Sequence, residues 1–276
     1  MRGGGRLTVL ALISVLALGA CGDDDEDEEG APPGGVTTTN VTTPLSPQLE
    51  AFCADVVRVQ TEEPDIPPDL PEEEQMRRQQ EFFQEQFLPL VRKIQGEAPP
   101  AAKGPIDEIS RFFEQKGPAA FDDDALPPIE ARANQAAATA CGAPESGVTG
   151  SEYAYQGMPR TLPAGRRLFQ FDNTGTELHE MVFLRKKPTT TESFDQLLAL
   201  PEAEGRQKAD FAGGLFAPPG GNDTALLDLT PGQYAIVCFI PVGFTPDVAE
   251  RAEESGQFPE DPPHFTRGMK SEFTVS

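Results

Sequence analysis

Four residues with metal-binding side chains follow one another in the C-terminal half of the chain. They are His179, Cys238, His264 and Met269, and the first and third are the only two histidines among 276 residues. Two neutral imidazoles and a thiolate, with a weak axial thioether, form a trigonal copper site. Such a site tolerates both oxidation states of copper and suits one-electron transfer. The four side chains therefore predict a site for one copper ion.

Short strands are expected to position these ligands. His179 opens the run HEMVF, Cys238 lies near the end of QYAIVCF, and His264 and Met269 flank the turn before SEFTV. Runs of apolar and aromatic residues, separated by turn sequences such as PAG and NTG, predict an all-β sandwich over residues 148–276. Within it, residues 191–214 are interpreted as a helical insertion followed by a loop.

Three stretches of this region resemble the cupredoxin family, the small blue copper proteins of the plastocyanin and azurin type. They are LPAGRRLFQFDNTGTELHEMVF, PGQYAIVCFIP and PHFTRGMKSEFTV. The resemblance implies a Greek-key β-sandwich with copper near one end. It also implies roles for the four residues: His179 as the first imidazole ligand, Cys238 as the thiolate, His264 as the second imidazole and Met269 as the axial ligand.

Three features depart from the family pattern, one of which is the large insertion between residues 184 and 228. The loop between the cysteine and the second histidine, residues 242–263, is longer than usual, and Glu180 stands where the family often has asparagine. Each ligand type also has an ordinary structural use, since a buried free cysteine often behaves as a small hydrophobic residue. Two further hypotheses therefore stand beside electron transfer: a metal-free cupredoxin-like binding or scaffold module, and a protein that stores or delivers copper(I).

Residues 46–142 show a helical period instead. In EEEQMRRQQEFFQEQFLPLVRKIQ apolar residues recur every three or four positions, and Pro89 is predicted to kink or break this helix. Shorter runs of the same kind predict an all-α bundle of about four helices. Cys53 falls in the first of them and Cys141 at the end of the last, which predicts a disulfide in an oxidising compartment.

The N-terminus has the features of a secretion signal. Arg2 and Arg6 precede an apolar run that ends in Leu18-Gly19-Ala20-Cys21, and this ending resembles the lipobox of bacterial lipoproteins. The resemblance implies a signal peptide over residues 1–20 and lipidation of Cys21, which would anchor the protein to a membrane on the extracytoplasmic face of the cell envelope. The acidic, Gly-, Pro- and Thr-rich residues 21–45 are predicted to form a solvated tether.

Charge and motifs narrow the function further. A net charge of −23 argues against nonspecific nucleic-acid binding and favours cationic partners, such as a redox protein or a copper donor. His179 and Glu180 begin like the HExxH motif of zinc proteases, but Phe183 stands where the second histidine belongs. The sequence therefore predicts a copper protein that is not an enzyme.

Overall fold

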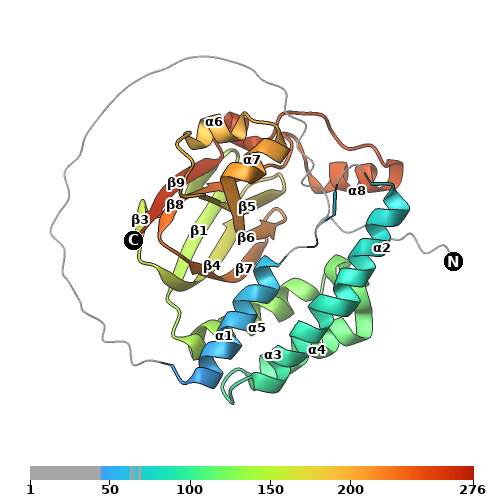
Figure 1. Ribbon diagram of the computed structural model, residues 1–276. Helices are drawn as coiled ribbons and strands as arrows, with labels where there is room; N and C mark the ends of the chain where they lie inside the picture. Colours follow the sequence, from blue (N-terminus) through green and yellow to red (C-terminus); the bar gives the residue numbers. More distant parts are fainter. Residues whose placement is uncertain (1–44, 63, 65, 68–69) are drawn as a thin grey trace.

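The computed structural model describes residues 45–276, except residues 63, 65, 68 and 69. The predicted signal peptide, Cys21 and nearly all of the predicted tether lie outside the described residues. No helix within the described part is long and apolar enough to cross a membrane. The described chain consists of a helical part and a β part that lie side by side (Figure 1).

The helical part contains α1 (Pro47–Thr61), α2 (Glu72–Phe82), α3 (Leu88–Glu97), α4 (Lys103–Lys116) and α5 (Leu126–Cys141). A π-helical turn, Phe83–Phe87, joins α2 directly to α3. Pro89 follows this turn, near the predicted break. Because proline has no N–H, it cannot donate to the carbonyl four residues earlier, and a π-helical turn is one way in which a helix accommodates a local irregularity.

The predicted disulfide is confirmed. Cys53 on α1 and Cys141 at the end of α5 are bonded, with their Cα atoms 5.9 Å apart. Both residues lie in an apolar cluster that also contains Leu168 and Leu226 of the β part. The two parts therefore share a core, and the disulfide ties together the helices that contact the sheet.

Polar contacts reinforce this interface. The side-chain amide of Asn134 on α5 donates to the carbonyl of Thr224 over 2.7 Å, and the Leu226 N–H donates to the side-chain oxygen of Gln60 over 2.8 Å. Both bonds satisfy backbone groups of one strand, which the helices would otherwise remove from water.

Two mixed sheets pack face to face in the β part. One has the order β2-β1-β4-β7 and the other β3-β9-β8-β5-β6, with parallel pairing of β1 with β4 and of β3 with β9. Their facing side chains form the largest described core, in which Phe169 and Phe171 meet Phe183 and Ile236. The strands are β1 (Glu145–Ser151), β2 (Ala154–Gln156), β3 (Thr161–Leu162), β4 (Gly165–Asn173), β5 (His179–Lys186), β6 (Ala209–Ala217), β7 (Asn222–Leu229), β8 (Gly232–Val237) and β9 (Lys270–Val275).

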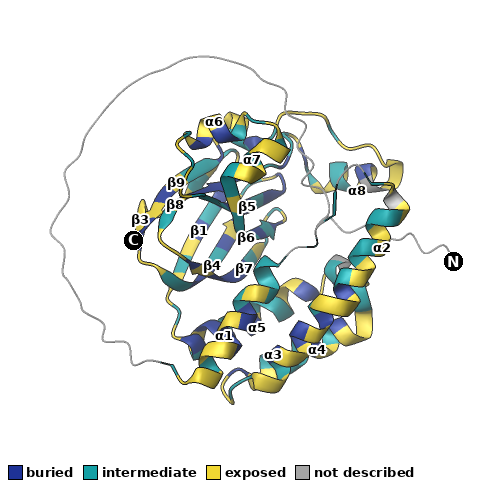
Figure 2. Ribbon diagram, viewed as in Figure 1, coloured by how far each residue is buried: buried dark blue, intermediate teal, exposed yellow. Residues whose placement is uncertain are grey.

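Helices cover the outer faces of both sheets, and Figure 2 shows buried residues along the strands between them. Helices α1 and α5 contact β7 of the first sheet, while Phe194 and Leu197 of α6 (Phe194–Leu198) pack with Ala235 and Val237 of the second. The short helix α7 (Glu202–Lys208) leads from α6 into β6. The predicted helical insertion is therefore partly present.

The prediction of a loop after that insertion is wrong. Residues 209–217 form β6, which pairs with β5 along its length. Gly213 and Gly214 weaken the local strand signal, but Gly213 has φ +129° and leaves room that the Leu227 side chain uses. Pairing with β5 and packing against the facing sheet thus override a weak local propensity.

The long loop 242–263 is ordered by its own helix and by its ends. Helix α8 (Pro246–Ser255) buries Ala252 against Phe244 and Ile240. Pro241 and Pro263 form a bridge, and the Val242 N–H donates to the Pro262 carbonyl over 3.0 Å. Since its two ends are bonded together, the loop delivers His264 from a fixed base.

Candidate metal centre

The ends of three adjoining strands bring the predicted ligands together. His179 is the first residue of β5, Cys238 follows the last residue of β8, and Met269 precedes β9. His264 opens a short 3-10 turn, His264–Arg267, that leads to β9. Because β8 runs antiparallel to both β5 and β9, the start of β5, the end of β8 and the start of β9 lie at the same edge of the sheet.

The ligand atoms of His179, Cys238 and His264 all lie within 4.8 Å of one another. The two Nδ1 atoms are 3.1 Å apart, and the Cys238 Sγ is 3.2 Å from the His264 Nδ1. Two atoms bound to one ion at about 2.0–2.3 Å each lie roughly 3–4 Å apart, so both separations suit a shared ion. All three side chains are 0% exposed.

Hydrogen bonds among the described residues do not satisfy all the ring nitrogens of the two histidines. The His264 Nε2 lies 2.9 Å from Glu177 Oε2, so it carries the ring proton and its Nδ1 presents a lone pair to the cluster. The His179 Nε2 is buried without a hydrogen-bond partner among the described residues, and the nearest charged group is Glu152, 3.7 Å away. If the His179 proton is on Nδ1, that atom can donate to the His264 Nδ1, but the His179 Nε2 lone pair then faces only the Glu152 carboxylate, which is an acceptor. If the proton is on Nε2, the lone pairs of the two Nδ1 atoms face each other.

A cation between the two imidazoles removes this conflict. It would accept both Nδ1 lone pairs and leave the His179 Nε2–H directed at the Glu152 carboxylate. The buried polar groups therefore fit a metal ion, and the donor set of two imidazoles and one sulfur fits copper or zinc.

Burial fixes the protonation of the ligands. It lowers the pKa of His179 to about 4, with a further contribution from His264, and it lowers the pKa of His264 as well. Both imidazoles are therefore neutral near pH 7 and able to ligate. Burial, and secondarily the charge of Glu180, raises the pKa of the Cys238 thiol. A thiolate there requires a compensating cation, which a bound metal ion supplies.

Met269 lies beside the ligands through its main chain. It is 0% exposed, its carbonyl accepts from the Cys238 N–H over 3.2 Å, and its own N–H donates to the His264 carbonyl over 3.2 Å. Its side chain belongs to the apolar cluster around Cys238. Ligation by the thioether stays a prediction.

Three carboxylates adjoin the candidate ligands, and no sequence motif predicts a role for any of them. Glu177 contacts His264, Glu152 lies near His179, and Glu180 donates its N–H to the Cys238 Sγ over 3.5 Å while its side chain accepts from the Phe239 N–H. Burial would raise the pKa of Glu152, but the N–H groups of Thr176 and Glu177 together with its own lower it to about 2.

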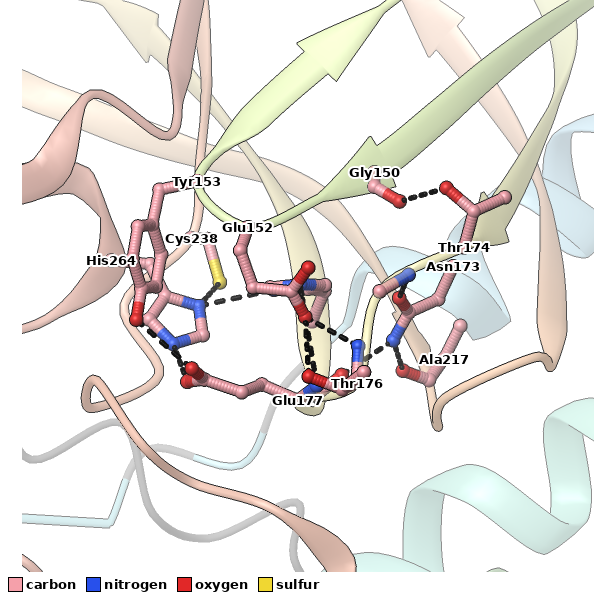
Figure 3. A network of polar contacts seen from close by, with 12 residues as sticks. Gly150, Glu152, Tyr153, Asn173, Thr174, Thr176, Glu177, Ala217, Cys238 and His264 are labelled. Carbon is pink, nitrogen blue, oxygen red and sulfur yellow. Dashed lines mark hydrogen bonds and ion pairs between the residues drawn. The ribbon is translucent and has the colours of Figure 1, made fainter.

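Burial raises the pKa of Glu180 to about 7, against the opposing effect of the Phe239 N–H. These contacts join residues 24 to 87 positions apart, so no local sequence pattern predicts them. Asn173, at the end of β4, fixes the loop that carries Glu177. Its amide nitrogen donates to the carbonyls of Glu177 and Ala217 over 2.8 and 2.9 Å (Figure 3).

No protein-family model and no curated protein matches the chain. Solved structures similar to it include a dithionite-reduced auracyanin from the photosynthetic bacterium Roseiflexus castenholzii, with 20% identity, 48% of this chain and 96% of that chain covered, and a TM-score of 0.31. Auracyanin A from Chloroflexus aurantiacus, described as a "blue" copper protein, has 14% identity over 48% and 99% of the two chains, with a TM-score of 0.30.

Rusticyanin from Thiobacillus ferrooxidans has 15% identity over 48% and 77% of the chains, with a TM-score of 0.28. Each match covers about half of this chain.

Proposed function

We propose that this protein binds one copper ion through His179, Cys238 and His264 and transfers single electrons at the cell envelope, as a cupredoxin-like protein. The observation that carries the proposal is the convergence of these three buried ligand atoms from three strand ends. Bound copper would supply a reversible change between Cu(II) and Cu(I). Met269 is proposed as the weak fourth ligand, and a Greek-key connection of the two sheets belongs to the same proposal.

The protein's part in this function is to hold the ligands in fixed positions. Strand pairing sets the positions of His179 and Cys238, and the closed base of the loop sets that of His264. The burial of these three side chains excludes water from the site. Catalytic metal sites keep an open ligand position for substrate, so burial favours electron transfer over the binding of an organic substrate at the metal. The proposed role is therefore not enzymatic.

Copper titration tests the proposal. Full-length protein purified in detergent is expected to take up one equivalent of copper(II) and to develop an intense visible thiolate-to-copper band. Cys238→Ser is expected to lose the band while its circular dichroism matches that of the wild type. Tight binding of copper(I) without a blue copper(II) form would instead favour storage or delivery, and a lack of copper binding would favour the metal-free module.

Lipid attachment at Cys21 and an extracytoplasmic location complete the proposal. The Cys53–Cys141 disulfide supports an oxidising compartment. Mass spectrometry of the purified protein is expected to show a lipid-modified N-terminal cysteine, and Cys21→Ser is expected to release the protein from the membrane fraction. Unmodified, membrane-bound Cys21→Ser protein would contradict the anchor. The net charge of −23 favours a basic redox or copper-donor partner.

A further inference from the structure

One carboxylate joins three separate elements around the second imidazole. Glu177 Oε2 accepts from the His264 Nε2 over 2.9 Å and from the Gly243 N–H over 2.6 Å, while its Oε1 accepts from the Tyr153 hydroxyl over 2.9 Å. Figure 3 shows His264 between the Cys238 sulfur and this carboxylate, with Tyr153 beside it. The Glu177 side chain is 11% exposed. The carboxylate therefore has one donor from each of the ligand, the long loop and the β1–β2 connection.

We propose that Glu177 is a positioning residue for the metal: it fixes His264 as the tautomer whose Nδ1 faces the cluster, and its charge favours copper(II) over copper(I). The preference for copper(II) rests on the proposed copper function, whereas the tautomer of His264 does not. A carboxylate that accepts from the distal N–H of a ligating histidine fixes the ring's orientation and raises its basicity.

The contacts of Glu177 and Tyr153 with His264, which we call the clamp, restrain the imidazole from two sides. The Tyr153 ring lies against the His264 ring with centroids 4.9 Å apart, so the imidazole is restrained on its face as well as at its Nε2. The bond to the Gly243 N–H holds the same carboxylate to the start of the long loop, just after Cys238 and the bridge at Pro241. The long loop, His264 and Glu177 thus form one hydrogen-bonded unit, which keeps His264 in place at the end of the loop.

Two substitutions separate geometry from charge. In Glu177→Gln, the amide oxygen accepts from His264 and Gly243, and the amide nitrogen donates to the Tyr153 hydroxyl, which accepts as well as it donates. This variant keeps the clamp and removes its charge. Glu177→Leu removes both. Glu260→Gln is the matched control, because Glu260 is an exposed acidic residue of the long loop 242–263 with no described contact to the cluster.

Copper affinity and reduction potential are the first readouts, measured on full-length protein in detergent. Glu177→Leu is expected to weaken copper(II) binding 10- to 100-fold, as loss of such partners does elsewhere. Glu177→Gln is expected to weaken copper(II) binding more than copper(I) binding, and each tenfold difference raises the one-electron potential by about 59 mV. Glu260→Gln is expected to match the wild type. Wild-type affinity and potential in both Glu177 variants would overturn the proposal.

The ring tautomer of His264 in metal-free protein is an independent readout. The chain has only two histidines, so long-range proton–nitrogen correlations of their rings are readily assigned. The wild type is expected to carry the proton on His264 Nε2, and Glu177→Leu to redistribute it. A proton on Nδ1 in the wild type would overturn the clamp even if the leucine variant does not fold. An Nε2 proton in a wild type that binds no copper would support the clamp while contradicting the proposed function.

Discussion

Removal of the disulfide is expected to destabilise the protein without dismantling the metal centre. The double variant Cys53→Ala and Cys141→Ala removes a bond between two residues that are 88 positions apart in the sequence. In the chain-entropy model, a loop of this length restricts the unfolded chain by about 4–5 kcal/mol at 25 °C. With a urea dependence of about 3 kcal/mol per molar, the midpoint falls by roughly 1.5 M.

The assay is urea unfolding followed by circular dichroism, with and without a thiol reductant. Oxidised wild type is expected to have the highest midpoint, and reductant to bring it close to that of the double variant, whose own midpoint does not respond. In the absence of urea, the double variant is expected to bind copper as the wild type does, because the candidate ligands lie at the ends of β5 and β8 and just before β9, whereas α1 and α5 pack mainly on β7. A loss below about 1 kcal/mol would refute the entropic reasoning, and loss of the copper site in folded variant would refute the separation of the two parts.

Two other predictions concern the axial position and the interface between the parts. Leucine has nearly the volume of methionine, so Met269→Leu is expected to lower the free energy of unfolding by less than about 1.5 kcal/mol. Because it removes a donor to copper(II), it is also expected to raise the reduction potential. An unchanged potential in voltammetry would place the thioether outside the coordination sphere. Burial, and secondarily the charge of Asp223, raises the pKa of Glu130 on α5 to about 8. The contribution of Glu130 to stability is therefore expected to fall as the pH rises from about 4.5 through 8, because the unfolded chain releases this proton first. Glu130→Gln is expected to remove this contribution only, so that the stability difference between variant and wild type changes across urea titrations at pH 5, 7 and 9; parallel profiles for the two proteins would contradict the assignment.

The convergence of His179, Cys238 and His264 was predictable because these are rare residues in a fixed order. His179 and Cys238 stand at the ends of apolar runs, which indicate strand ends, and His264 lies shortly before a third such run. Antiparallel pairing then brings these strand ends to one edge. The helical region was predictable for a similar reason, because its apolar period is strong. Cys53 and Cys141 lie in segments whose helical period is clear, and the structure bonds them.

The surroundings of the ligands were not predictable from local pattern. Glu177 is one acidic residue among 45, and only folding brings it to His264, Gly243 and Tyr153. Strand β6 was missed because Gly213 and Gly214 break its apolar alternation, and the pairing that stabilises it comes from a segment more than twenty residues away. Long-range contacts, rather than local propensity, determine both features.

X-ray absorption at the copper edge identifies the atoms bound to the metal. For protein loaded with one equivalent of copper, we predict one sulfur scatterer at about 2.2–2.3 Å and two imidazole nitrogens at about 2.0 Å. The sulfur contribution should vanish in Cys238→Ser, and one imidazole contribution should vanish in His264→Ala. A copper environment of oxygen and nitrogen alone in the wild type would contradict the assignment of this cluster as a thiolate copper site.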